Sequence, residues 1–150
     1  MWNTYVPVNV QPGLNKTHYT IDGNPIPLAR ARHGKGRTWD SQKQVKFACG
    51  LQLKSQNFNQ ELFNCPLALD VTFFLPIPHR LPKRKKDLCH HSPHATIPDL
   101  SNLIKFIEDV ATGILYKDDA LIATITAKKV YSSVPRTELS LTKLTTIADV

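Results

Sequence analysis

The most regular helix of this chain begins within the stretch Pro98-Asp99-Leu100-Ser101-Asn102-Leu103-Ile104-Lys105. From there, apolar residues recur at the spacing of one helix face, namely Leu100, Leu103, Ile104, Ile107, Val110, Ala111 and Ile114. Asn102, Lys105 and Asp109 fall on the opposite side, at about 100° per residue. Asp99 stands at the start, where a carboxylate can cap the free backbone amides. The pattern predicts a helix that carries polar groups along its outer face.

A second acidic step, Lys117-Asp118-Asp119, follows this helix and precedes an alternating strand. It places carboxylates at both ends of one helix. Asp99 and Asp119 can converge only if the next strand runs back beside the helix start, or if the fold completes the site in another way. The sequence leaves both possibilities open.

The remaining patterns predict further elements in both directions from this helix. They are a strand over Tyr19 to Ile21, an extended or hairpin segment over Pro25 to Asp40 with a basic tip, a helix from Asp40 or Ser41 to about Ser55, a strand over Leu67 to Leu75, a loop over His79 to Ile97, and strands over Ala120 to Tyr131 and Thr137 to about Leu144. We therefore expect an α/β (α+β) fold in which two main helices cover a small mixed β-sheet of about four strands.

Length and composition indicate a single domain over residues 1–150, with 1–16 as a loosely held lead-in. The chain has 150 residues, of which 41% are hydrophobic, enough for a core of its own. Its three cysteines do not make a disulfide framework, which favours a reducing compartment. No leader pattern and no long apolar run is visible. We expect a cytoplasmic protein and no membrane partner.

The net charge of +7 and the isoelectric point near 9.5 favour a polyanionic partner. The cations gather in two groups that we expect to grip a DNA backbone in a salt-dependent way: Arg30, Arg32, Lys35 and Arg37 in the first, and Lys83, Arg84, Lys85 and Lys86 in the second. The aromatic-studded strand motif of common RNA-binding modules is missing, so an RNA partner is the weaker reading.

Three stretches together resemble the RusA family of Holliday junction resolvases. They are Pro98 to Lys105, then Gly113-Ile114-Leu115-Tyr116-Lys117-Asp118-Asp119-Ala120, and Pro135-Arg136-Thr137-Glu138-Leu139. Pro27 to Arg32 is similar to the basic N-terminal segment of that family. The resemblance covers roughly Tyr19 to Lys143, and its second half is the specific one.

The resemblance implies a homodimeric, Mg²⁺-dependent endonuclease, with Mn²⁺ as a substitute, that nicks two strands of a branched, four-way DNA junction symmetrically. By position, the metal-binding acidic residues of the family fall on Asp99 and Asp119, with Asp118 beside them. The other catalytic positions fall on Lys105, Asn102 and His94. One position departs from the family pattern, because Ser101 stands where the family has a second acidic residue.

These residue types suit phosphodiester hydrolysis. Mg²⁺ takes hard oxygen ligands and keeps several waters, so two or three carboxylates suffice. Lys105 can offset charge that develops on the phosphate, Asn102 can orient a group, and His94 can act as a ligand or a proton carrier. The alternative is a non-catalytic basic DNA-binding module that keeps the fold and has lost full metal binding through Ser101. A zinc site at Cys89, His90, His91 and His94 is disfavoured by their spacing.

Overall fold

The computed structural model describes residues 16–144 and confirms a mixed α+β fold with a four-stranded sheet. In chain order the elements are β1 (Lys16–Asp22), β2 (Arg32–Gly34), β3 (Arg37–Trp39), α1 (Lys43–Gln56), β4 (Leu67–Pro76), α2 (Lys83–Cys89), α3 (Leu100–Ala111), a 3₁₀ turn (Asp119–Leu121), β5 (Ile122–Ser132) and β6 (Arg136–Lys143). Strands β2 and β3 form a separate two-stranded hairpin.

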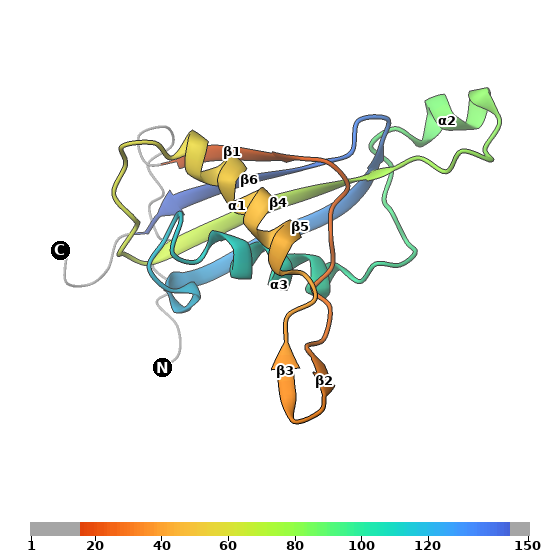
Figure 1. Ribbon diagram of the computed structural model, residues 1–150. Coiled ribbons are helices and arrows are strands. Elements are labelled where there is room, and N and C mark those ends of the chain that lie inside the picture. Colours follow the sequence, from red (N-terminus) through yellow and green to blue (C-terminus); the bar gives the residue numbers. More distant parts are fainter. Residues whose placement is uncertain (1–15, 145–150) are drawn as a thin grey trace, which may run out of the picture.

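The main sheet has the order β1-β6-β4-β5 (Figure 1). Strands β1 and β4 run antiparallel to β6, whereas β4 and β5 are parallel. A parallel pair needs a crossover connection, and here that connection contains α2 and α3. The predicted key helix is therefore part of the link between the two parallel strands.

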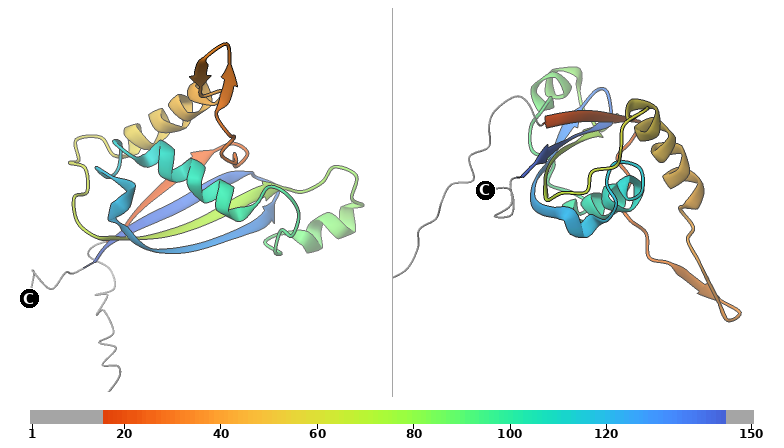
Figure 2. Two further views of the ribbon diagram at one scale, coloured as in Figure 1. Left: turned by 90° about the horizontal axis from the view of Figure 1, so that it is seen from below. Right: turned by 90° about the vertical axis from the view of Figure 1, so that its left-hand side faces the viewer.

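Helices α1 and α3 cover one face of this sheet (Figure 2). The alternation of β4 sends Leu67, Leu69, Val71 and Phe73 towards them, and each of these side chains is at most 2% exposed. From α3, the core receives Leu103, Phe106, Ile107, Val110 and Ala111. Phe106 joins this face although the predicted apolar pattern omitted it. The other face of the sheet carries exposed polar side chains such as Asp70 and Glu138, as is usual for a sheet covered on one side.

Several predicted boundaries need correction. Helix α1 begins at Lys43, and its N-cap residue Gln42 makes no side-chain cap. Asp40 instead accepts a hydrogen bond from the Gln42 amide at 2.8 Å, because the chain turns once more before the helix starts. Lys16 already belongs to β1, and the rest of the predicted lead-in lies outside the described residues.

Two further segments differ from the predictions. The loop expected over residues 79–97 contains α2, a helix with no buried residue and hence no apolar periodicity to reveal it. The strand expected from Ala120 begins at Ile122, because the preceding residues form the 3₁₀ turn. Across residues 16–144, no helix combines the length and the apolar character needed to cross a bilayer.

Candidate active site

Asp99 lies at the start of α3 with its carboxylate exposed. It occupies the N-cap position, and its backbone carbonyl accepts the amides of Asn102 and Leu103 at 3.1 and 3.2 Å. Its side chain, however, makes no capping hydrogen bond, so the predicted cap role of the carboxylate is wrong. Cis peptide geometry at Ile97-Pro98 precedes it. Because it caps no backbone amide, the Asp99 carboxylate faces solvent, where it can meet a ligand.

Lys129 of β5 holds the segment in front of Asp99. Its ammonium group donates to the carbonyls of Thr96 and Pro98, at 2.5 and 2.6 Å. Pro98 is bonded directly to Asp99, so this clamp fixes the peptide that carries the exposed carboxylate. The sequence analysis missed Lys129, and only the non-local pairing of residues 92–98 with β5 gives it this role.

His94 lies beside the same clamp. Its amide donates to the Lys129 carbonyl at 3.1 Å, and its ring is tilted against the Tyr131 ring at 4.6 Å between centroids. Nδ1 is buried with no hydrogen-bond partner among the described residues. Burial lowers the pKa of His94, and the nearby Lys129 charge lowers it further. Both effects favour the neutral form of the imidazole, the form that can accept a proton or bind a cation.

Asn102 and Lys105 follow Asp99 along α3. The Asn102 carbonyl accepts the Leu28 amide at 2.9 Å, which ties the segment before the β2–β3 hairpin to the start of α3. The Asn102 side chain is half-buried, whereas Lys105 is exposed. The Lys105 charge also opposes the upward shift of the Glu108 pKa, so its ammonium group lies within electrostatic range of that carboxyl.

Asp118 and Asp119 lie at the far end of α3. The Asp118 carboxylate accepts the Ala120 amide at 2.9 Å. This bond, together with a hydrogen bond to Asp119, lowers the pKa of Asp118. The same bond between the two carboxyls raises the pKa of Asp119. Burial raises the pKa of Glu108, and the Asp119 and Asp109 charges raise it further, so Asp119 faces the last turns of α3.

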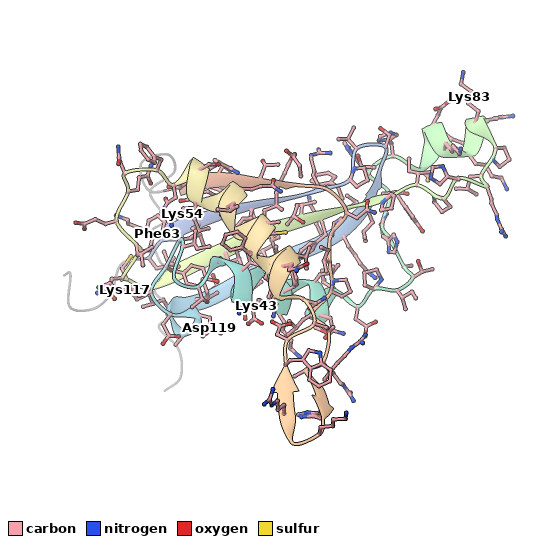
Figure 3. All side chains as sticks on the ribbon, viewed as in Figure 1. Lys43, Lys54, Phe63, Lys83, Lys117 and Asp119 are labelled. Carbon is pink, nitrogen blue, oxygen red and sulfur yellow. The ribbon has the colours of Figure 1, made fainter. Side chains whose placement is uncertain are left out.

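One chain does not bring Asp99 and Asp119 together. Glu108, which senses the Asp119 charge, is nine residues beyond Asp99, and nine residues of α-helix span about 14 Å. Figure 3 places Asp119 at the end of the molecule opposite Lys83 of α2. Among residues 16–144, no three acidic, histidine or cysteine side chains are grouped closely enough to hold one metal ion. Each end of α3 therefore offers only part of the expected ligand set.

The first predicted group of cations lies on an arm that leaves the body of the molecule. Strands β2 and β3 project beyond α1 as an isolated hairpin (Figure 1). All of its predicted DNA-binding side chains are exposed: Arg30, Arg32, Lys35 and Arg37. These cations are therefore accessible to a partner.

Lys46 fastens the base of this arm to the two helices. Its ammonium group contacts the Asp40 carboxylate at 2.6 Å and the Asp109 carboxylate at 3.3 Å. Burial works to lower the Lys46 pKa, but the hydrogen bonds to Asp40 and Asp109 outweigh it, so the net pKa is raised. Asp109 was expected on the outer face of α3. Its carboxylate forms an ion pair with Lys46 and so links α3 to α1 and to the base of the arm.

The second predicted group of cations lies on α2, which projects from another side of the molecule (Figures 1 and 2). Lys83, Arg84 and Lys85 are exposed, and Lys86 is half-buried. The segment between α2 and α3 leads directly to Asp99, and the segment before the β2–β3 hairpin is bonded to Asn102. The exposed Asp99 carboxylate therefore lies between two basic projections.

Comparison with known proteins identifies a family and two relatives of this chain. Residues 22–142 match the family model described as endodeoxyribonuclease RusA. A protein of Lactococcus phage r1t named as a crossover junction endodeoxyribonuclease is 34% identical over 114 residues, which cover 74% of this chain and 81% of that protein. An uncharacterized Bacillus subtilis (strain 168) protein, YqaN, is 28% identical over 130 residues, covering 81% of this chain and 92% of its own length. The chain belongs to the RusA endodeoxyribonuclease family.

Proposed function

We propose that this protein is a Mg²⁺-dependent endonuclease that resolves four-way DNA junctions by paired symmetric nicks. The observation that carries the proposal is the exposed Asp99 carboxylate, uncapped and set between two basic projections, in a chain of the RusA family. Cations on both sides of a carboxylate suit a polyanionic substrate whose scissile phosphate meets an acidic group.

A homodimer completes the site in this proposal. A two-fold axis beside the middle of α3 places the start of one helix next to the end of its partner's. Asp99 of one subunit then approaches Asp119 of the partner subunit, although the two residues are far apart along one helix. The same symmetry provides two equivalent sites, which paired nicks require.

The donor set brought together in this way fits Mg²⁺ or Mn²⁺. Asp99 and Asp119, with Asp118 beside it, supply hard carboxylate oxygens, and Ser101 supplies a hydroxyl one residue into α3. These residues would hold the ion, which would supply activation of a water and neutralisation of charge on the phosphate.

The polar residues around Asp99 have separate roles in the proposal. Lys105 offsets negative charge that develops on the phosphodiester, and Asn102 orients the substrate or a water from the next helical position. Burial and the Lys129 charge lower the pKa of His94 and so favour its neutral form, the form in which an imidazole can accept a proton. Lys129 acts through the backbone in front of Asp99 and is a positioning residue.

The two basic projections bind the DNA arms in a salt-dependent manner. Such a protein works where chromosomal or phage DNA is found, and we propose a cytoplasmic, nucleoid-associated location. Neither projection packs tightly against the body of the molecule, so both can adjust to a branched substrate.

Cleavage of a labelled four-way junction, beside a matched linear duplex, tests the proposal. The native chain should give paired nicks in the junction only when Mg²⁺ or Mn²⁺ is present. Asp99→Asn should lose cleavage and keep junction binding, whereas Asp22→Asn, at an exposed aspartate of β1, should cut as the native chain does. Metal-independent cutting, or full activity of Asp99→Asn, would contradict the proposal.

The second candidate is a non-catalytic DNA-binding module, and Ser101 is the observation that favours it. Under this alternative, the native chain binds the junction tightly and cuts nothing with either metal. The variant Ser101→Asp separates the two candidates. It should gain metal-dependent cleavage if a missing carboxylate ligand is all that prevents it.

A further inference from the structure

A pocket of about 660 Å³ lies at the base of α2, apart from the Asp99 carboxylate. Its walls come from the end of β4, from α2 and from the turn between β5 and β6. Ile77, Pro78 and Pro135 supply apolar surface. Lys83 and Lys86 supply two positive charges, His90 an imidazole, and Asp87 one carboxylate. The described roles of Asp99, His94 and Lys105 make no use of this pocket.

A buried hydroxyl adds a directed polar group to the pocket. Ser132 is only 2% exposed and lies among the lining residues. Its oxygen accepts the Val134 amide at 3.1 Å and an Arg136 guanidinium N–H at 3.4 Å. Both bonds use the oxygen as an acceptor, so neither uses the hydroxyl hydrogen.

The segment between α2 and α3, which pairs with the end of β5, connects the pocket to Asp99. The segment after α2 runs beside the end of β5: the His91 amide donates to the Tyr131 carbonyl at 2.8 Å, and the His94 amide donates to the Lys129 carbonyl at 3.1 Å. Lys129 then holds the Pro98 carbonyl next to Asp99. Ser132 is three residues from Lys129 along β5, about 10 Å. The pocket therefore lies on the side of the Lys129 clamp where β5 ends.

We propose that this pocket receives one unstacked nucleotide of the bound DNA. The apolar walls suit a base, the two lysines outnumber the single carboxylate of Asp87 and suit a phosphate, and the volume is within the range of about 300 to 1,000 Å³ typical of small-ligand sites. A base inside a duplex is stacked and cannot enter such a pocket, whereas extrusion costs least where stacking is already interrupted. The crossover of a four-way junction is such a place. The inference rests on the proposed junction binding and adds a means of selecting branched DNA.

Junctions that carry 2-aminopurine test this inference, because the fluorescence of this base rises when it leaves the stack. The fluorophore is placed at successive positions on either side of the crossover, and the native chain is added in the presence of a chelator, so that no strand is cut. We expect a severalfold rise at one position. Ile77→Trp, which fills the pocket, should still bind the junction and should lose the rise. Val134→Trp, at an exposed neighbouring residue that does not line the pocket, should keep it.

The outcomes separate this inference from the proposed function. Junction binding and cleavage without a fluorescence rise at any position would overturn the pocket assignment alone. A rise that persists in bound Ile77→Trp would do the same, and Pro135→Trp repeats the test from the opposite wall if Ile77→Trp does not fold. Failure of the native chain to bind the junction would overturn both proposals.

Discussion

At the scale of single residues, the geometry around Asp99 depends on two carbonyl groups and one ammonium group. Lys129 donates to Thr96 and Pro98, and both carbonyls belong to the segment that leads into α3. A hydrogen bond to a charged group contributes about 1.5 to 3 kcal/mol to stability, more than a neutral one. The clamp thus fixes the Asp99 peptide and also stabilises the link between β5 and α3.

The variant Lys129→Met tests this clamp. We expect the free energy of unfolding to fall by about 1.5 to 3 kcal/mol, because the donor to both carbonyls is lost. Cleavage should fall further than junction affinity, because Asp99 is displaced while both basic projections remain. Urea unfolding and separate kcat and KM values measure these effects. Lys128→Met, at the exposed neighbour, should change neither; equal effects of the two variants would contradict a specific clamp.

His94 makes folding stability depend on pH. Its pKa in the folded protein is lowered by burial and by the Lys129 charge, whereas an unfolded chain has the ordinary histidine value of about 6.5. The unfolded state therefore binds the proton first as the pH falls. This contribution to stability is complete above about pH 6.5 and is lost as the pH drops through the folded pKa.

In the variant His94→Gln, the free energy of unfolding should depend less on pH below about pH 6.5. Urea unfolding of the native chain and of His94→Gln at about pH 7.5 and about pH 5.5 measures the difference. We expect the native chain to lose more stability on acidification than the variant does. An identical loss in both proteins would show that His94 does not carry this dependence.

Sequence reasoning reached Asp99 but not Lys129, and the reason is physical. The start of α3 is encoded locally, by Pro98 and by the apolar spacing that begins at Leu100. The clamp depends instead on how residues 92–98 pair with β5, a contact between segments more than thirty residues apart. The same limit explains the missed cap: Asp99 has the right position, but its side chain does not turn towards the helix amides.

At the scale of elements, the sequence predicted one of the two basic projections, the β2–β3 hairpin, and missed the other, helix α2. The β2–β3 hairpin was expected because glycines and basic residues lie between short extended stretches, and Lys35 and Gly36 do form the turn with positive φ. Helix α2 was expected to be a loop. Its lysines are good helix formers, but no apolar face of α2 is buried, so periodicity could not reveal it.

The hairpin charges should set much of the salt dependence of DNA binding. Replacing Arg32, Lys35 and Arg37 together by Gln removes three exposed cations. Each phosphate contact contributes about 0.9 to the slope of log affinity against log salt concentration, so the slope should fall by about 2.7 for each subunit, or about 5.4 for the proposed dimer. Junction titrations over a range of salt concentrations measure it. Lys54→Gln, on the last turn of α1, is the control and should leave the slope unchanged. An unchanged slope in the triple variant would exclude the hairpin from the interface.

At the scale of the whole molecule, the four-stranded mixed sheet with two covering helices agrees with the prediction from the order of apolar patterns. The sequence did not decide whether Asp99 and Asp119 converge in one site. In a single chain, they lie at opposite ends of α3. Strand and helix patterns describe one chain, so they cannot encode how a second copy packs. The proposed dimer supplies what one chain lacks.

Complementation between two inactive variants tests the shared site most directly. Asp99→Asn and Asp119→Asn are prepared separately and are also co-expressed with two different tags, so that mixed dimers can be isolated. If each site takes Asp99 from one subunit and Asp119 from the other, a mixed dimer contains one complete site and one site that lacks both carboxylates. Junction cleavage in Mg²⁺, read strand by strand, is the measurement.

The account predicts that neither variant cuts alone and that the mixed dimer makes one nick per junction. An unsorted equal mixture should then hold about a quarter of the native number of active sites. A mixed dimer as inactive as its parents, beside a fully active native dimer treated in the same way, would contradict the account, because every site would then depend on Asp99 and Asp119 of the same chain.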